Sequence, residues 1–194
     1  MKRPTTSADE EISRCIRILK EGGILLYPTD TIWGIGCDAT NAAAVEKIYK
    51  LKNRTESKSM IILTDTPERI QRYVKVMPEM AWDLIDFAES PLTIIYPEGQ
   101  NLAANVIADD RSVAIRVVKD EFCRQLIRQL GKPIVSTSAN LSGEIPPVNY
   151  NAIDQRIIEG VDHAVDASFG QPGNFRPSQI IKLEVNGEFR IIRK

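Results

Sequence analysis

Histidine and unbalanced charge are what this sequence most obviously lacks. Its 194 residues contain one histidine, His163, so a metal site built on several histidines is excluded and a histidine-dependent triad would have to use that residue. Lys and Arg total 25 against 26 Asp and Glu, which gives a net charge of −1. A protein that binds a polyanion through bulk charge is therefore disfavoured, although a local basic patch is not.

Cysteine motifs and long apolar runs are also missing. Cys15, Cys37 and Cys123 are odd in number and form no CxxC motif, which favours reduced thiols, most simply small buried hydrophobes, over disulfides or zinc. No apolar run approaches the roughly 18 to 20 residues of a membrane-spanning helix. Residues 1–11 contain no apolar export signal. We therefore expect a cytoplasmic protein without membrane contact.

What is present is an ordinary globular composition, 43% apolar and 26% charged, in which helix and strand patterns alternate. At roughly 150 residues per domain, the length predicts one domain over residues 1–194. The patterns predict helices that begin at a Ser7–Glu10 capping box, at Ala42, after Pro67, after Pro78 and at Phe122. They predict strands at 24–27, 60–63, 92–96, 113–117 and from 133 onward.

The last two predicted strands, 180–183 and 189–192, flank an Asn186-Gly187 pair. This arrangement predicts a β-hairpin with a two-residue type I′ turn, in which both central residues have positive φ. Because this hairpin follows alternating helices and strands, we expect an α/β fold with a twisted mixed sheet, flanking helices and a C-terminal β-hairpin.

Two polar segments directly follow predicted strands. Residues Pro28–Gly36 place hydroxyl groups where ligands collect in α/β folds, but they are equally typical of a turn in which Thr29 and Asp30 act as local caps. Residues Ser136–Gly143 carry four hydroxyls and an amide, a set that suits phosphate, ribose or an amino acid, and that is also common in turns.

Cationic side chains mark two further candidates. Five basic residues fall between Lys47 and Lys58; the first part belongs to a helix with a solvated face, whereas the part from Lys52 lies in a loop suited to gripping a triphosphate. No GxxxxGK[ST] loop occurs. Arg116 lies inside an apolar strand, where a lone arginine is usually exposed at a sheet edge or ion-paired; if it faces the same cleft, it would be a clamp for a carboxylate.

Taken in order, these segments resemble the YrdC family of threonylcarbamoyl-adenylate synthases, in its short, single-domain form. The matching pieces extend from about Arg14 to the C-terminus. They are Gly22–Gly36, the KxR-like Lys52-Asn53-Arg54, Pro91-Leu92-Thr93, Val113–Val117, Ser136–Gly143 with its SxN, and Pro177-Ser178. Each piece is weak alone, and their shared order makes the resemblance specific.

The resemblance implies an α/β domain with a concave, positively lined sheet face and a nucleotidyltransferase reaction. L-threonine, bicarbonate or CO₂ and ATP, carried by Mg²⁺, would give threonylcarbamoyl-AMP and pyrophosphate, and no protein metal site is implied. The product would go to a tRNA-modifying threonylcarbamoyl transferase, with direct tRNA or double-stranded RNA contact left open. Such chemistry needs positioning and charge neutralisation more than an acid–base histidine.

The resemblance also implies roles for individual residues. Those expected to bind L-threonine are Thr31, Arg116, Ser136 and Ser178, with Arg116 on the carboxylate. Those expected to bind ATP are Lys52, Arg54, Lys58, Ser112, Ser138, Asn140, Pro146 and Arg193. Of these, Lys52 and Arg54 are the expected catalytic pair.

Two other functions stay open. The first is a YrdC-like paralogue that lacks the synthase activity, which the intact Ser138-Ala139-Asn140 motif disfavours. The second is an RNA-binding module that uses the basic concave face without catalysis, which the net charge of −1 disfavours because RNA binding depends on many phosphate contacts.

Overall fold

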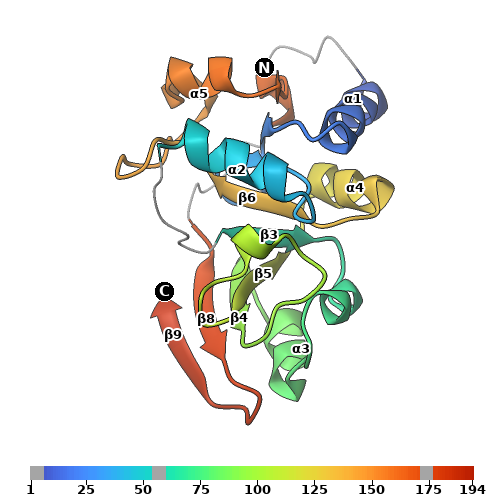
Figure 1. The fold of residues 1–194 in the computed structure, drawn as a ribbon, viewed down its shortest axis with the longest axis vertical. Helices are drawn as coiled ribbons and strands as arrows, with labels where there is room; N and C mark the ends of the chain where they lie inside the picture. Colours follow the sequence, from blue (N-terminus) through green and yellow to red (C-terminus); the bar gives the residue numbers. More distant parts are fainter. Residues whose placement is uncertain (1–6, 54–59, 171–176) are drawn as a thin grey trace.

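A nine-stranded mixed β-sheet runs through the computed structural model (Figure 1), which describes residues 7–53, 60–170 and 177–194. The strand order is β7-β1-β2-β6-β3-β5-β4-β8-β9. The strands are β1 (Leu25–Tyr27), β2 (Gly34–Gly36), β3 (Ile61–Thr64), β4 (Leu92–Tyr96), β5 (Val113–Val117), β6 (Ile134–Ser138), β7 (His163–Ala164), β8 (Gln179–Leu183) and β9 (Phe189–Arg193). Three neighbouring pairs, β1–β7, β3–β5 and β4–β8, are parallel and the others antiparallel, which confirms the predicted mixed sheet.

The helices gather mainly around one half of this sheet. Figure 1 shows α1, α2, α4 and α5 in the upper half of the view and α3 in the lower half, beside β4 and β5. The α-helices in the described residues are α1 (Ala8–Lys20), α2 (Ala42–Leu51), α3 (Glu79–Asp86), α4 (Glu121–Leu130) and α5 (Gln155–Gly160). Short 3₁₀ turns occupy Glu68–Arg72, Ala104–Val106, Tyr150–Ala152 and Ala167–Phe169.

The helix ends follow the local sequence chemistry. The predicted capping box is confirmed: the Ser7 hydroxyl accepts from the Glu10 N–H at 3.3 Å, and the Glu10 carboxylate accepts from the Ser7 N–H at 3.1 Å. At α4 the Asp120 carboxylate caps the first turn, and Gly131 ends the helix with a φ of 76°. These ends fix where α1 and α4 begin to pack on the sheet.

The C-terminal hairpin is confirmed, but its predicted turn type is wrong. Gly187 has a φ of 87°, whereas Asn186 is not among the described non-glycine residues with positive φ. The Gly187 N–H donates to the Glu184 carbonyl at 3.0 Å, and the Glu184 N–H donates to the Glu188 carbonyl at 2.8 Å. The loop is therefore longer than the two residues of a type I′ turn, and a single left-handed residue closes it.

Three elements lie where the sequence patterns predicted none, namely β2, β7 and α5. The two strands are only three and two residues long, and β2 reads Gly-Ile-Gly, so neither carries an alternating apolar pattern. The segment after Pro67 forms a 3₁₀ helix of five residues where the sequence predicted an ordinary helix. Tertiary hydrogen bonding, more than local propensity, forms these short elements.

The apolar core is continuous across the sheet and includes all three cysteines. Cys15, Cys37 and Cys123 are buried free thiols, as predicted. Burial, together with the nearby Glu11 carboxylate, raises the pKa of Cys15 to about 12. In the part of the chain that the structure describes, none of the helices has the length and apolar character needed to cross a membrane.

Candidate active site

Strand register places several predicted functional residues on one face of the sheet. Arg116 on β5 lies opposite Thr93 on β4 and Leu63 on β3, and Ile61 on β3 lies opposite Ser136 on β6. Directly opposed residues and residues two apart in a strand point to the same side. Four strands therefore present Thr93, Arg116, Ser136, Ser138 and Ile180 on a common face.

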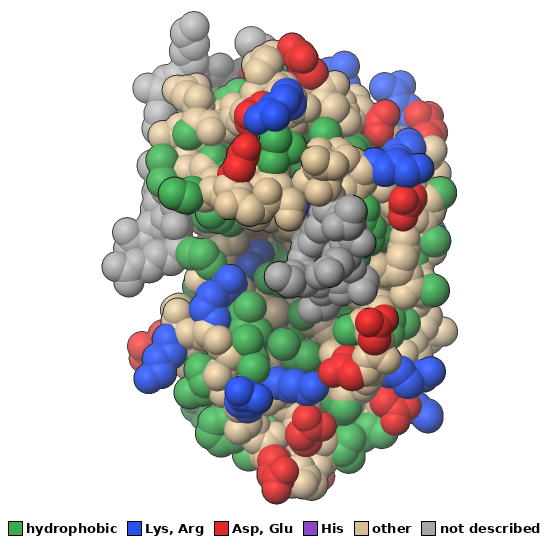
Figure 2. Space-filling model, turned by 60° about the vertical axis from the view of Figure 1, so that its left-hand side comes forward, with side chains coloured by type: hydrophobic (Ala, Val, Ile, Leu, Met, Phe, Trp, Pro, Cys, Tyr) green, Lys and Arg blue, Asp and Glu red, His purple; other side chains and the backbone are tan. Residues whose placement is uncertain are grey.

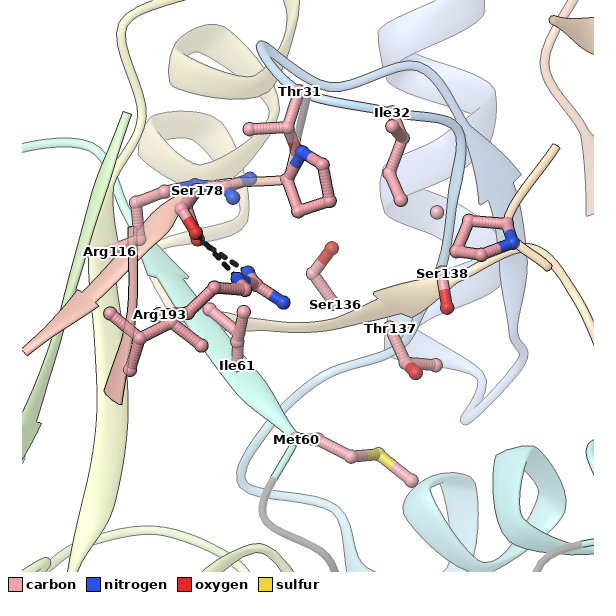
Figure 3. Close-up of a pocket in the computed structure, with 14 residues that line it drawn as sticks. Thr31, Ile32, Met60, Ile61, Arg116, Ser136, Thr137, Ser138, Ser178 and Arg193 are labelled. Carbon is pink, nitrogen blue, oxygen red and sulfur yellow. Dashed lines mark hydrogen bonds between the residues drawn. The ribbon is translucent and has the colours of Figure 1, made fainter. Parts of the chain in front are cut away.

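This face contributes to a cavity of about 290 Å³ (Figure 3). The loop between β1 and β2, the end of β6, the start of β8 and the end of β9 complete its wall. The predicted residues that line it are Thr31, Arg116, Ser136, Ser138, Pro146, Ser178 and Arg193. The fold thus brings together side chains that are up to 162 positions apart, from Thr31 to Arg193.

Arg116 has the ion-pair partner that one interpretation of its sequence position required, and it is not exposed at a sheet edge, whereas its role as a carboxylate clamp stays a prediction. Its side chain is buried, and one Nη2 nitrogen lies 3.0 Å from the Oδ1 oxygen of Asp30. Among the described residues its Nε has no hydrogen-bond partner although it is buried. A buried guanidinium with a free donor at the edge of a cavity is suited to an anionic ligand, and above all to a carboxylate.

A second guanidinium approaches from β9. The Nε of Arg193 donates to the Ser178 carbonyl at 2.9 Å and its Nη2 donates to the Ser178 hydroxyl at 3.3 Å, as the dashed lines in Figure 3 show. Partial burial, and then the nearby charge of Arg116, lowers the pKa of Arg193. Two like charges held this close make the cavity attractive to anions.

The hydroxyl groups of the cavity are held in place by other hydroxyls. Ser178 and Thr93 share a hydrogen bond of 2.7 Å in the sheet, and Thr31 and Thr29 share one of 2.9 Å in the loop. Because each hydroxyl both donates and accepts, these pairs can still bind a polar ligand. The cavity combines two cations with oriented neutral groups, and its described lining contains no carboxylate.

Lys52 and Asn140 support the cavity wall through hydrogen bonds to its backbone. Neither is among the residues that line it. Lys52 is buried, and its ammonium group donates to the carbonyls of Ser138 and Asn140. The Asn140 amide donates to the carbonyls of Leu141 and Glu144, both at 2.8 Å. Their visible contacts therefore fix the loop that follows β6.

Of the remaining predicted residues, Ser112 is described by the structure and lies away from the cavity lining. The Ser112 hydroxyl donates to the Asp110 carboxylate at 2.6 Å, and Ser112 does not line the cavity. Arg54 and Lys58 lie outside the described residues. His163 pairs with Glu11 at 2.6 Å between β7 and α1 and does not line the cavity. That pair adjoins Cys15, and the three residues each offer one ligand atom within 4.8 Å of the others.

Sequence reasoning missed two contributions to the site. The first is the ion pair between Asp30 and Arg116, because the sequence predicted at most that Asp30 caps a local turn. The second is the apolar part of the wall, formed by Ile32, Met60 and Ile61. The register of β3 against β6 reveals Ile61, and no sequence pattern gives that register for four-residue strands.

Comparison with known proteins gives a consistent set of relatives. A family model described as telomere recombination, named for the Sua5, YciO and YrdC proteins, matches residues 17–194. The threonylcarbamoyl-AMP synthase of Pseudoalteromonas translucida is 31% identical over 185 residues, which cover 94% of this chain and 97% of that protein. The threonylcarbamoyl-AMP synthase of Idiomarina loihiensis is 32% identical over 171 residues, or 87% and 91% of the two chains.

A solved structure of P. abyssi Sua5 complexed with L-threonine is similar in fold, with a TM-score of 0.82 and 26% sequence identity. The similarity covers 93% of this chain and 53% of that one, so this chain spans about half the length of the Sua5 chain.

Proposed function

The chain belongs to the family of the Sua5, YciO and YrdC proteins, and from this membership we propose that it is a threonylcarbamoyl-AMP synthase whose substrates meet in the cavity of Figure 3. It joins L-threonine, bicarbonate or CO₂ and ATP and releases pyrophosphate, which makes it a nucleotidyltransferase. The observation that carries the proposal is the convergence of Arg116 and Arg193 with five hydroxyl residues in one cavity.

L-threonine occupies the deeper end of the cavity in this proposal. Its carboxylate pairs with Arg116, whose buried Nε has no other partner among the described residues. Thr31, Ser136 and Ser178 contact the amine and hydroxyl groups of the substrate through oriented hydroxyls. Ile32 and Ile61 supply apolar surface for the methyl group.

ATP lies on the side of Ser138, Pro146 and Arg193. The further nucleotide ligands that the family resemblance implies are Arg54, Lys58, Asn140 and Ser112. Lys52 supports the nucleotide site by fixing the end of β6, where Ser138 lies. The described lining offers hydroxyls but no carboxylate for a metal ion, so Mg²⁺ would enter with the phosphates of ATP.

The residues would act by positioning and charge neutralisation. The threonine nitrogen attacks CO₂, loses a proton and becomes a carbamate. A carbamate oxygen then attacks the α-phosphorus of ATP, and pyrophosphate leaves. Arg116 and the hydroxyls hold threonine in line with the phosphate, and Arg193 and Arg54 offset the negative charge that gathers there. No histidine is required in these steps.

The proposed setting follows from the reaction. A tRNA-modifying threonylcarbamoyl transferase would consume the product, so we place the protein in the cytoplasm as one domain over residues 1–194. RNA contact would use basic side chains such as those that Figure 2 shows in and below the central hollow of the molecule. At the C-terminal end, Arg193 lines the cavity, and Lys194 lines a neighbouring one.

The decisive experiment measures pyrophosphate released from ATP–Mg²⁺ and bicarbonate, with and without L-threonine. We expect release that requires threonine, and we expect Arg193→Ala to lower it at least tenfold. Arg190→Ala is the matched control, because this exposed arginine is also on β9 but does not line the cavity. Pyrophosphate release that is absent, or independent of threonine, would contradict the proposal and favour the paralogue. RNA binding that is steeply salt-dependent and unaffected by threonine would favour the RNA-binding module.

A further inference from the structure

In the described part of the chain, the Arg116 guanidinium forms an ion pair with Asp30. Its Nη2 lies 3.0 Å from Asp30 Oδ1, and the two side chains are only 3% and 9% exposed. An arginine side chain has several rotatable bonds, so a strand position alone does not fix where its donors point. The ion pair with Asp30 supplies that fixed point.

Asp30 comes from a different part of the chain than the strand that it supports. It lies in the loop between β1 and β2, 86 positions before Arg116. Its other oxygen, Oδ2, accepts from the backbone N–H of Lys119, just beyond the end of β5, at 3.4 Å. Both recorded contacts of the carboxylate therefore reach β5 or its end, and neither caps the local turn.

The Nε of Arg116 is buried without a hydrogen-bond partner among the described residues, and Arg116 is one of the residues that line the cavity of Figure 3. Asp30 does not line this cavity; it lines a neighbouring one of about 480 Å³ that shares Arg193 and Pro177 with it. Asp30 thus contacts Arg116 from outside the proposed threonine site.

The local charge balance favours the same role. Arg116 and Arg193 bring two positive charges to the cavity, and Asp30 offsets one of them. Because the proposed function assigns Arg193 to the nucleotide, recognition of the threonine carboxylate depends on where the donors of Arg116 point and not on net charge alone. Asp120, the other buried carboxylate nearby, caps α4 through the Cys123 N–H at 2.9 Å, and its contact with Arg116 is only electrostatic.

We propose that Asp30 is a positioning residue for substrate recognition: it fixes Arg116 so that the free edge of the guanidinium binds the carboxylate of L-threonine. The inference rests on the proposed function, because it assumes that threonine is the ligand of Arg116. It assigns to Asp30 no contact with substrate.

The test is the preference of the protein for L-threonine over L-threoninamide, which lacks the negative charge, measured by calorimetric titration together with ATP affinity. We expect Asp30→Ala to lower this preference about tenfold and to leave ATP affinity within about twofold. Asp30→Glu should recover part of the preference. Asp65→Ala is the matched control, since Asp65 is also a buried carboxylate, 3.1 Å from Arg69, and does not line either cavity.

A double-mutant cycle separates positioning from a general structural effect. If Asp30 acts through Arg116, adding Asp30→Ala to Arg116→Ala changes the preference by less than about twofold. Should Asp30→Ala unfold the protein, Asp30→Asn, which keeps the shape and removes the charge, replaces it in the cycle.

The outcomes distinguish a failure of the proposed function from a failure of the positioning role of Asp30. Wild-type protein that does not bind L-threonine would contradict the proposed function itself. If the wild-type protein prefers threonine, two results would overturn only the positioning role. In the first, the Asp30 variant keeps the full preference. In the second, the effects of Asp30→Ala and Arg116→Ala on the preference are additive.

Discussion

At the scale of single residues, Lys52 shows how a side chain can support a cavity wall without lining it. Its buried ammonium group donates to the carbonyls of Ser138 and Asn140, and these contacts fix the end of β6, which places Ser138 at the cavity. The sequence motif singled out Lys52, but only the fold shows that it meets backbone carbonyls here. Its predicted catalytic role stays a prediction.

Lys52→Met should therefore impair the site and the fold together. The substitution leaves two carbonyl groups without their donor, which costs about 1–3 kcal/mol of unfolding free energy. We expect the KM values for both threonine and ATP to rise, because the loop after β6 borders both proposed sites. Urea unfolding and steady-state kinetics measure the two effects. Lys50→Met, at a position where the side chain is 76% exposed, should change neither.

At the scale of elements, β2 contains two glycines with different constraints. A Cβ atom at Gly36 would lie 2.4 Å from the Val135 carbonyl oxygen, so β2 can approach β6 only without a side chain there. A Cβ atom at Gly34 would lie 3.0 Å from the Ser136 hydroxyl, on the wall of the cavity. Gly36 therefore allows β2 to pack closely against β6, and Gly34 keeps space open at the cavity wall.

Alanine at Gly36 should mainly affect stability, and alanine at Gly34 should mainly affect threonine binding. Gly36→Ala should lower the free energy of unfolding by about 1–3 kcal/mol, as overpacking does, while threonine still binds to the folded fraction. Gly34→Ala should leave stability within about 1 kcal/mol and weaken threonine binding several-fold. Denaturant titration and calorimetry provide the comparison. Equal effects of the two variants on stability would contradict the assignment of Gly34 to the cavity wall.

The β8–β9 hairpin is tied to the loop before β5 through Asp110, and this tie gives a pH prediction. The Ser112 hydroxyl, followed by Lys182 at 2.9 Å, lowers the pKa of Asp110 to about 2. Because the folded-state pKa is below the ordinary value of 3.8, the stabilisation is present above about pH 4 and is lost as the pH falls toward 2. The Asp110 side chain is about half exposed, so the effect stays below about 1 kcal/mol.

Comparison of wild-type protein with Asp110→Asn measures this contribution. The wild-type protein should have the higher urea midpoint at pH 6, and the difference should shrink as the pH falls below 4. A difference that grows on acidification would mean that the carboxylate destabilises the folded state.

At the scale of the whole molecule, local patterns predicted more of the architecture than of the site. Helix α1, α4 and the terminal hairpin follow from caps, apolar periodicity and turn residues, which act over a few positions. The arrangement of Arg116, Ser136 and Ser178 in one cavity depends on which strands are neighbours, and no local pattern determines that. The family resemblance named these residues as threonine ligands, which stays a prediction, and the fold shows that they line one cavity. The ion pair between Arg116 and Asp30 could be found only from the fold.

The sheet also determines whether the chain behaves as one domain. The half of the sheet with β1, β2 and β6 joins the half with β5, β4 and β8 through β3, which pairs with β6 at three positions and with β5 at four. The proposed ligand cavity draws residues from both halves, since Ser136 belongs to one and Arg116 to the other. A continuous sheet and core of this kind should unfold in one cooperative step.

The two tryptophans report separately on these halves. Trp33 is buried beside Tyr150, with ring centroids 4.9 Å apart, in the half with β2, and Trp82 is half-buried on α3 in the other half. The Trp82→Phe variant retains Trp33, and the Trp33→Phe variant retains Trp82. In each variant we expect the fluorescence and the far-ultraviolet circular dichroism to change over the same range of urea concentration. If α3 and the strands beneath it were a separate unit, the Trp82 fluorescence would change at a different urea concentration from the circular dichroism signal. Coincidence in both variants would mean that losing either half dismantles the cavity, because neither half alone contains both the arginines and the β6 hydroxyls.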